Sequence, residues 1–216
     1  MKLYPVLLNI EGRLAVVVGG GEVALRKVLD LLDAGALVKV VAPRMHEGMD
    51  EARGANPERV RLERREYRDG DLEGASLAFA ATDSPAVNRS VFDEASRRGV
   101  FINAADDPPN CSFYLPSFVR KGDFLMAVST SGASPALAAR LRRELEKAVP
   151  ENVGDMLAAL REARRLLQED ESFEAMDFNS RGELLKKIVG DDALLARCAG
   201  AYRAGRLREE LVGLIG

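Results

Sequence analysis

Residues that bind metals or form disulfides are scarce in this chain. Its 216 residues include two cysteines, Cys111 and Cys198, and a single histidine, His46. The cysteines lie far apart and form no Cys-x-x-Cys pair, so one chain cannot assemble a zinc site with ordinary ligand spacing. We therefore expect no resident metal, and any metal that the protein meets is expected to be a substrate.

An excess of charge of one sign and long apolar runs are also missing. The 31 Lys and Arg residues face 34 Asp and Glu residues, which gives a net charge of -3 and excludes the basic excess of a typical nucleic-acid binder. No apolar run approaches the ~18 to 20 residues that span a bilayer, and the first residues lack the apolar core and cleavage site of a signal peptide. We expect a soluble, cytoplasmic protein with reduced thiols and with neither nucleic acid nor membrane as a partner.

The first part of the chain alternates between strand and helix patterns. Leu14 to Val18 is a short apolar run rich in β-branched residues, typical of a strand buried on both faces of a parallel sheet. It ends at a run of three glycines, a helical pattern follows until Gly35, and a second strand from Leu37 to Ala42 is ended by Pro43. Strand, Gly-rich turn, helix and strand make half of a dinucleotide-binding fold.

The alternation continues beyond this unit. Further strands are predicted at Val60–Glu66, Leu77–Ala81 and Val100–Asn103, with a helix at Ser84–Arg98. Five strands with intervening helices predict an α/β domain of the Rossmann type, with a doubly wound parallel sheet.

The pattern changes after residue 112. Phe113–Val119 and Phe124–Thr130 read as two extended segments, and Ser134 with Pro135 begins a helix whose leucines share one face. So small a piece buries little surface alone, so we expect it to pack on a second copy of the chain. The remainder has a helical pattern. The predicted domains are a Rossmann domain at 1–112, a small α+β dimerisation segment at 113–150 and a helical C-terminal domain at 151–216.

The Gly-rich turn carries the first functional motif. Gly19, Gly21 and Ala24 match the pattern G-x-G-x-x-A between a strand and a helix. Gly19 permits the tight turn, Gly21 lets the backbone approach a pyrophosphate, and Ala24 lets the helix pack closely on the strand. The free N–H groups of the helix then face the phosphates. The motif predicts a dinucleotide site, and the alternative is a tight turn that binds nothing.

The usual acidic partner of the ribose hydroxyls is missing, because the second strand is followed by Pro43 and Arg44. Arg44 could bind a 2′-phosphate and so favour NADP. Alternatively, it is a solvated side chain beside an adenosine site made by the backbone. The residues alone leave both interpretations open.

Polar residues follow the fourth and fifth predicted strands, where open α/β domains bind their ligands. Thr82 and Asp83 are candidates for cofactor binding, or they cap the helix that begins near Ser84. Asp106 is a candidate acid–base group, although it and Asp107 are also good turn formers.

Two other reactive side chains are interpreted as structural. Cys111 reads as a small packed residue, because no histidine accompanies it in the sequence to make it a nucleophile. His46 lies in a polar stretch and reads as a surface residue.

Several spaced motifs agree in their order with one known family. The chain resembles precorrin-2 dehydrogenase, which is often also sirohydrochlorin ferrochelatase and forms the N-terminal module of siroheme synthase. The resemblance runs from about residue 2 to 150 and rests on Tyr4-Pro5, Val18 to Lys27, Ala80 to Asp83, Asn103-x-x-Asp106, Ser112-Phe113-x-x-Pro116-Ser117 and the Ser-rich stretch that ends at Pro135.

The resemblance implies an enzyme of siroheme biosynthesis that oxidises the tetrapyrrole precorrin-2 to sirohydrochlorin with NAD, and often also inserts Fe²⁺ into sirohydrochlorin as a lyase. It also implies a homodimer whose central segment exchanges between subunits, with a helical C-terminal domain beside the active site. It places the essential aspartate at Asp106. The dinucleotide site then comprises the turn residues Gly19, Gly20, Gly21 and Ala24, the family's cofactor contacts Glu22, Val23, Pro43 and Arg44, and the candidates Thr82 and Asp83.

Two further points follow from the resemblance. Arg44 is then expected to accompany NAD, since the family normally lacks the acidic ribose partner. A serine that is phosphorylated in the fused enzyme is replaced here by Thr130, so that regulation is not expected.

The implied substrate carries eight carboxylates, which would seek basic groups. The candidates are Arg120, Lys121, Arg140, Arg142 and Arg143, with a solvated surface as the alternative for each. A different class of function also stays open, because a Rossmann dimer that senses NAD or binds a ligand without catalysis would use the same fold.

Overall fold

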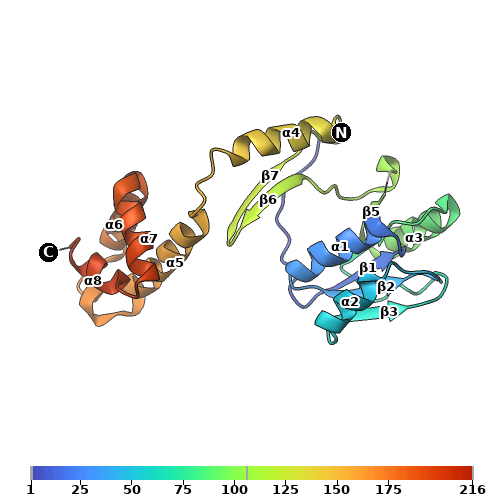
Figure 1. Cartoon of the computed structure of the whole chain (residues 1–216), viewed down its shortest axis with the longest axis horizontal. Helices are drawn as coiled ribbons and strands as arrows, with labels where there is room; N and C mark the ends of the chain where they lie inside the picture. The colour runs from blue at the N-terminus through green and yellow to red at the C-terminus, as the bar shows by residue number, and fades with distance from the viewer. Residues whose placement is uncertain (1, 106, 216) are drawn as a thin grey trace. The chain divides into compact units, whose positions relative to one another are not determined.

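The computed structural model describes residues 2–105 and 107–215. The chain forms two compact units, of which the first ends at Leu115 and the second begins at Pro116 (Figure 1). The finer division predicted from the sequence, at residues 112 and 150, stays a prediction.

The first unit contains a parallel sheet of five strands in the order β3-β2-β1-β4-β5. This order confirms the predicted doubly wound Rossmann-type sheet. The direction of winding reverses between β1 and β4, so the loops that follow these strands flank the crevice where such sheets bind ligands. The strands are β1 Leu14–Val18, β2 Leu37–Val41, β3 Val60–Glu63, β4 Leu77–Ala80 and β5 Phe101–Ala104.

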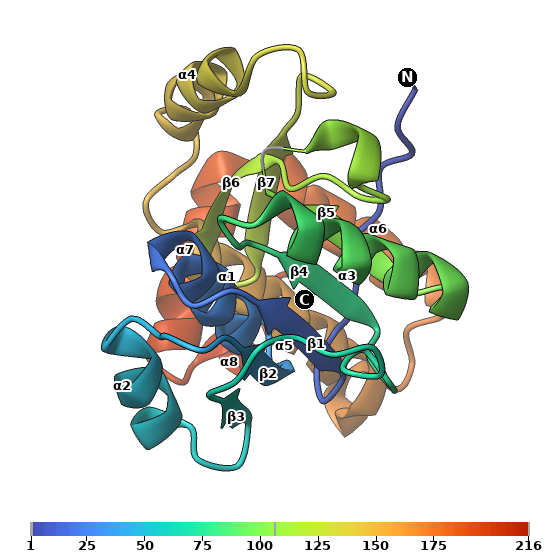
Figure 2. The ribbon, with the colours of Figure 1, turned by 90° about the vertical axis from the view of Figure 1, so that its right-hand side faces the viewer.

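Helices cover both faces of this sheet (Figure 2). Successive side chains of a strand point to opposite faces, and β1 divides its residues accordingly. Ala15 and Val17 belong to a core with α1 and α2, whereas Val16 and Val18 belong to a core with α3. The helices are α1 Glu22–Asp33, α2 Gly48–Ala55 and α3 Pro85–Arg98.

The helix α2 was not predicted. It is short, contains Gly48 and Gly54, and buries only Met49 and Ala52, so its sequence carries little helical periodicity. The extended segment expected from Phe113 also differs from the structure, because the strand there begins only at residue 117.

The crossover from β3 to β4 has no helix among the described residues. A buried carboxylate holds it instead. Asp71 is 5% exposed and accepts two hydrogen bonds of 2.7 Å from the Arg65 guanidinium, and Lys39 lies 3.4 Å away. Glu94 of α3 is fully buried and accepts hydrogen bonds from the Tyr67 hydroxyl and the Leu72 N–H. Polar bonds replace the packing that a helix would supply.

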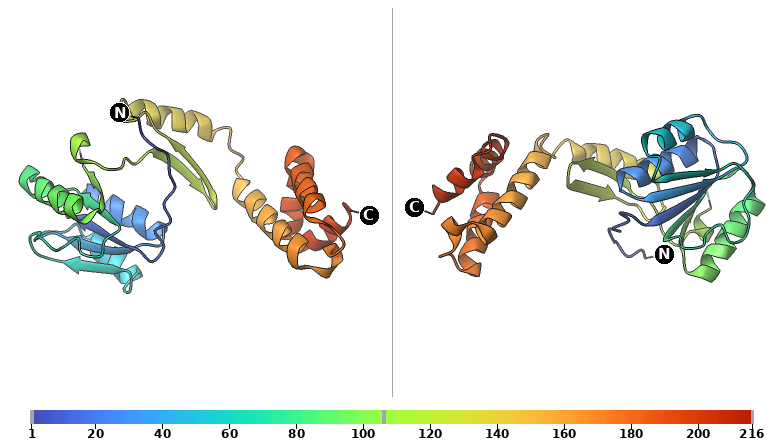
Figure 3. Two further views of the ribbon diagram at one scale, coloured as in Figure 1. Left: turned by 180° about the vertical axis from the view of Figure 1, so that it is seen from behind. Right: turned by 90° about the horizontal axis from the view of Figure 1, so that it is seen from below.

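The second unit begins with an antiparallel hairpin of β6 Ser117–Lys121 and β7 Phe124–Val128. The helix α4, Pro135–Glu146, lies along the hairpin (Figure 3), and the Ser134 hydroxyl caps it by accepting from the Leu137 N–H at 3.2 Å. The Ser134 N-cap and the first-turn Pro135 are confirmed, and the two strands are present with bounds that differ from the predicted ones. The leucines of α4 form an apolar face that stays 41% to 49% exposed in the single chain: Leu137, Leu141 and Leu145.

The rest of this unit is a helical bundle, as predicted. Its core surrounds the fully buried Phe173 and includes Leu167, Ile188 and Leu211. No helix within the described part of the chain is long and apolar enough to cross a membrane. The helices are α5 Val153–Glu169, α6 Phe178–Gly190, α7 Asp192–Arg203 and α8 Leu207–Val212.

Candidate cofactor and catalytic site

The glycine turn after β1 lies against the loops that follow β2 and β4. Gly19 has φ +131°, and a Cβ there would lie 2.1 Å from the carbonyl oxygen of Ala81. A Cβ on Gly20 would lie 1.9 Å from the carbonyl oxygen of Arg44. Both neighbours are backbone atoms that cannot rotate away. The absence of side chains at Gly19 and Gly20 therefore lets three loops meet at the carboxyl edge of the sheet.

Gly21 differs from the two glycines before it. It is the N-cap of α1 with φ -80°, and no atom of the described residues lies within 4 Å of a Cβ built on it. No side chain in that part of the chain caps α1 either, and the first helical bond runs from the Leu25 N–H to the Gly21 carbonyl. The N–H groups and positive end of the helix dipole thus face open space, and the residues fit a dinucleotide pyrophosphate.

The neighbouring cofactor candidates have the exposure that ligand contact requires. Glu22 is exposed and Val23 is 41% exposed, whereas Ala24 is fully buried, which suits its predicted packing role. Pro43 and Arg44 are exposed after β2. The structure brings the Arg44 backbone against the glycine turn and leaves its side chain at the surface.

The loop after β4 is organised by a residue that the sequence analysis missed. The Thr82 hydroxyl donates to Asn88 Oδ1 at 2.7 Å, and Asn88 Nδ2 donates to the Thr82 carbonyl at 3.0 Å. The helix cap is Ser84, whose hydroxyl accepts from the Val87 N–H at 3.4 Å, so neither Thr82 nor Asp83 caps α3. Asp83 is exposed at the same edge. The only signal in the sequence for these two Thr82–Asn88 hydrogen bonds was an asparagine near the start of a helix.

Asp106 lies outside the described residues, and its neighbours define the loop that carries it. The Ala105 N–H donates to the Ala80 carbonyl at 2.8 Å, so the chain is still paired with β4 just before this position. After it, the Asp107 carboxylate accepts from Asn110 Nδ2 at 2.6 Å, and the Asn110 N–H donates to the Asp107 carbonyl at 3.0 Å. Asp107 therefore has a turn-forming role, and the acid–base role of Asp106 stays a prediction.

Cys111 and His46 have structural roles, as predicted. The half-buried Cys111 thiol packs against the second core of the sheet, and burial raises its pKa. His46 is exposed, and its Nδ1 accepts from the Gly48 N–H at 3.1 Å at the start of α2.

The basic residues proposed to bind substrate carboxylates all lie in the second unit, on β6 and α4. Arg142 is paired with Glu146 at 2.5 Å, which partly neutralises its charge. The other side chains are exposed or half-buried: Arg120, Lys121, Arg140 and Arg143.

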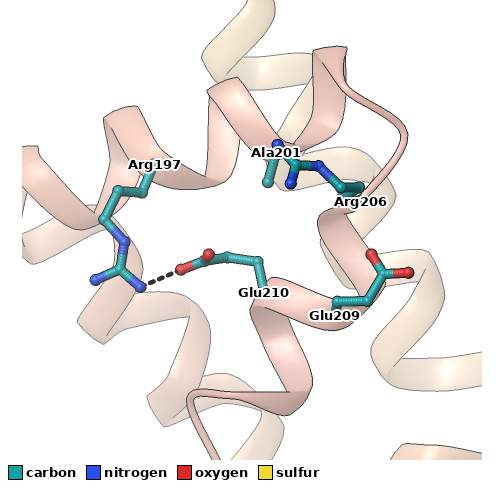
Figure 4. A pocket seen from close by; sticks show the side chains of 5 residues that line it. All are labelled: Arg197, Ala201, Arg206, Glu209 and Glu210. Carbon is teal, nitrogen blue, oxygen red and sulfur yellow. Dashed lines mark hydrogen bonds and ion pairs between the residues drawn. The ribbon is translucent and has the colours of Figure 1, made fainter.

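Two cavities of the described residues lie away from this edge of the sheet. One of about 320 Å³ lies between α7 and α8, where Arg197 is paired with Glu210 (Figure 4). Its charged lining residues are Arg197, Arg206, Glu209 and Glu210, so the charges balance. Another, of about 430 Å³, lies beside the amino ends of β1 and β2, opposite the edge where such sheets bind ligands. Within residues 2–105 and 107–215, no group of three His, Cys, Asp or Glu side chains could hold a metal ion.

Comparison with known proteins agrees with this geometry. Residues 6–117 match a family described as "Putative NAD(P)-binding", and residues 126–148 match "Sirohaem biosynthesis protein central". The chain belongs to this NAD(P)-binding family of sirohaem biosynthesis. The match supports a nicotinamide cofactor and does not distinguish NAD from NADP.

Similar proteins carry related names. The chain is 42% identical over 154 residues to a siroheme synthase of Nitrosococcus oceani, covering 71% of this chain and 32% of the relative. A siroheme synthase of Pseudomonas paraeruginosa is 39% identical over 172 residues, or 78% and 36% of the two chains. The chain thus spans about a third of the length of these curated relatives. A solved structure of SirC, a precorrin-2 dehydrogenase, is 28% identical with a TM-score of 0.74 over 97% of both chains.

Proposed function

We propose that the protein is an NAD-dependent precorrin-2 dehydrogenase, which oxidises precorrin-2 to sirohydrochlorin in siroheme biosynthesis. The observation that carries the proposal is the open, uncapped helix start at Gly21, at the same sheet edge as the loop containing Asp106. Likeness to SirC over 97% of the chain supports the substrate assignment. The relative's name alone would not carry it, because one fold hosts many functions.

The chain's own residues have two tasks in this reaction. Bound NAD accepts a hydride, and the protein supplies position and proton transfer. The N–H groups at the start of α1 would bind the pyrophosphate of this cofactor. The carboxylate of Asp106 accepts the proton that leaves the tetrapyrrole, a contribution of ~10² to 10⁴ in rate for a well-placed base.

We assign NAD rather than NADP as the cofactor. The resemblance to precorrin-2 dehydrogenase supports NAD, and the surface position of Arg44 is compatible with an adenosine site made by the backbone of the β2 loop. A 2′-phosphate would need a basic partner, which makes the Arg44 side chain the decisive one to vary.

The deciding experiment compares two adjacent carboxylates. NADH formation is followed by its near-ultraviolet absorbance after mixing protein, NAD and precorrin-2. Asp106→Asn should lower turnover by ~10²-fold or more with little change in substrate affinity, because proton acceptance is needed chiefly in the transition state. Asp107→Asn is the matched control and should retain turnover, since an asparagine can still accept from Asn110.

The outcomes separate the competing functions. Absence of NADH formation by the unaltered protein, with NAD binding intact, would favour a sensor without catalysis. Normal turnover by Asp106→Asn together with loss of turnover in Asp107→Asn would move the acid–base role to Asp107.

We also propose that the protein forms a homodimer through residues 113–150. A second proposed reaction is the insertion of Fe²⁺, as substrate, into sirohydrochlorin. Asp106→Asn should impair both reactions, because protons leave the same bound macrocycle.

A further inference from the structure

The loop after β4 meets the glycine turn at the peptide that joins Ala81 to Thr82. A Cβ on Gly19 would lie 2.1 Å from the Ala81 carbonyl oxygen, 2.7 Å from the Ala81 carbonyl carbon and 3.3 Å from the Thr82 nitrogen. All three atoms belong to this one peptide, which is planar and trans. The orientation of the peptide therefore decides how closely the loop approaches the glycine turn.

The Asn88 side chain fixes this orientation. Its Oδ1 accepts from the Thr82 N–H at 3.3 Å, and its Nδ2 donates to the Thr82 carbonyl at 3.0 Å. Because the N–H and C=O of a trans peptide point in opposite directions, the bond from the Thr82 N–H to Asn88 directs the Ala81 carbonyl oxygen towards Gly19. One carboxamide thus pairs both backbone groups of Thr82, as a residue of a neighbouring strand would.

No other group duplicates these two bonds. In the part of the chain that the structure describes, the Thr82 N–H and carbonyl have no further hydrogen-bond partner. The Thr82 hydroxyl lies 3.2 Å from the Ser84 carbonyl oxygen and accepts from the Ser84 N–H at 3.2 Å, but these contacts do not involve the Ala81–Thr82 peptide. The Ala81 N–H donates to the Val18 carbonyl at 2.8 Å, so the pairing with β1 fixes only the preceding peptide.

Asn88 is itself held firmly against the sheet. It is half-buried near the start of α3, and its N–H donates to the Ser84 carbonyl at 3.0 Å. Val91 of the same helix is fully buried in the core that contains Val16 and Val18 of β1. The side chain of Asn88 therefore connects a fixed helix to the loop beside the glycine turn.

We infer that Asn88 is a positioning residue for the nicotinamide cofactor: it holds the Ala81–Thr82 peptide against Gly19 and so keeps the two loops in the arrangement that admits the dinucleotide. The inference rests on the proposed cofactor site at the glycine turn, and it assigns no contact between Asn88 and the cofactor. Without the two bonds, the loop would adopt this arrangement for only a fraction of the time, and the apparent affinity would fall by that fraction.

The test makes the same substitution at two half-buried asparagines of the first unit. Asn88→Leu keeps the branched shape of the side chain and removes both bonds to the Thr82 backbone. Asn56→Leu is the matched control, because Asn56 ends α2, donates to the Ala52 carbonyl at 3.1 Å and accepts from Arg59. We expect NAD affinity by calorimetry to fall roughly tenfold in Asn88→Leu and to stay at the parent value in Asn56→Leu. Both variants should melt at a lower temperature, since each loses hydrogen bonds.

Amide hydrogen exchange tests the two bonds without any cofactor. In the protein free of NAD, the Thr82 amide should exchange roughly tenfold faster in Asn88→Leu than in the parent and in Asn56→Leu. The Ala81 amide is the internal reference, because its partner is the Val18 carbonyl, and its exchange should change less.

The outcomes separate this inference from the proposed function. Parent-like NAD affinity in folded Asn88→Leu would overturn the inference and leave the cofactor site in place, as would parent-like exchange of the Thr82 amide. An equal loss of affinity in Asn56→Leu would also overturn it, because lower stability would then explain the loss. If Asn88→Leu fails to fold, Asn88→Ala removes the same bonds without added volume and decides instead. A parent that binds neither NAD nor NADP would overturn the cofactor site and the inference together.

Discussion

Two neighbouring glycines should respond in opposite ways to the same substitution. Gly20→Ala places a Cβ 1.9 Å from the Arg44 carbonyl oxygen, 2.9 Å from the Arg44 carbonyl carbon and 3.0 Å from the Ala42 Cβ. Gly21→Ala places a Cβ where no described atom lies within 4 Å, at a φ of -80° that any residue adopts. Gly20→Ala should therefore damage the fold, whereas Gly21→Ala should leave it intact.

The magnitudes follow from these contacts. Neither the Arg44 carbonyl nor the Gly20 backbone can move without disturbing β1 or β2, so Gly20→Ala should cost about 1 to 3 kcal/mol, as overpacking does. In a domain of this size, each kcal/mol lowers the melting temperature by roughly 4 °C. At Gly21, the weaker N-cap of an alanine costs about 0.5 to 1 kcal/mol, and the stiffer unfolded chain returns about as much. The net change there should stay within about 0.5 kcal/mol.

Thermal unfolding and calorimetry test the pair. Gly20→Ala should melt several degrees lower than the parent, and Gly21→Ala should melt like it. A larger variant, Gly21→Val, should keep the fold and lose NAD binding, because its branched side chain occupies the space in front of the helix N-terminus. Parent-like melting of Gly20→Ala would refute the close approach of the two loops. Unchanged NAD affinity in Gly21→Val would refute the phosphate cradle.

Other predictions concern charge. Leu141→Asp, on the exposed leucine face of α4, should weaken dimerisation in sedimentation experiments, and an unchanged dimer would place the interface elsewhere. Arg44→Ala should barely change NAD affinity by calorimetry. If instead the parent prefers NADP and Arg44→Ala abolishes that preference, Arg44 binds a 2′-phosphate. Hydrogen bonds from Arg65 lower the pKa of Asp71 to about 2. Because this folded-state pKa lies below the unfolded value, Asp71 should contribute about 2 kcal/mol above pH 4 that disappears towards pH 2. Denaturant unfolding should show this pH dependence in the parent and lose it in Asp71→Asn.

The sequence by itself determined the elements whose physics is local. Leu14 to Val18 is buried on both faces because it is apolar throughout, and its boundaries agree with β1. Gly19 has the positive φ of a tight turn and Ala24 the full burial that their spacing predicts, and the role of Gly21 towards a pyrophosphate stays a prediction. Ser134 and Pro135 begin α4 because a cap and a first-turn proline act within one turn. In each case, the cause lies within a few residues of its effect.

Only the tertiary structure decided which distant residues complete these elements. The role of Gly20 depends on Arg44, which reaches it through the fold of β2 beside β1. Asn88 accepts from the Thr82 hydroxyl, and Asn110 donates to the Asp107 carboxylate, and neither bond was predicted from the sequence. The Cys111 sulfur accepts from the Ala104 N–H at 3.2 Å because β5 lies at the edge of the sheet, where no strand pairs its outward groups. Strand order is a property of the whole sheet, and no local pattern encodes which strand will lie at its edge.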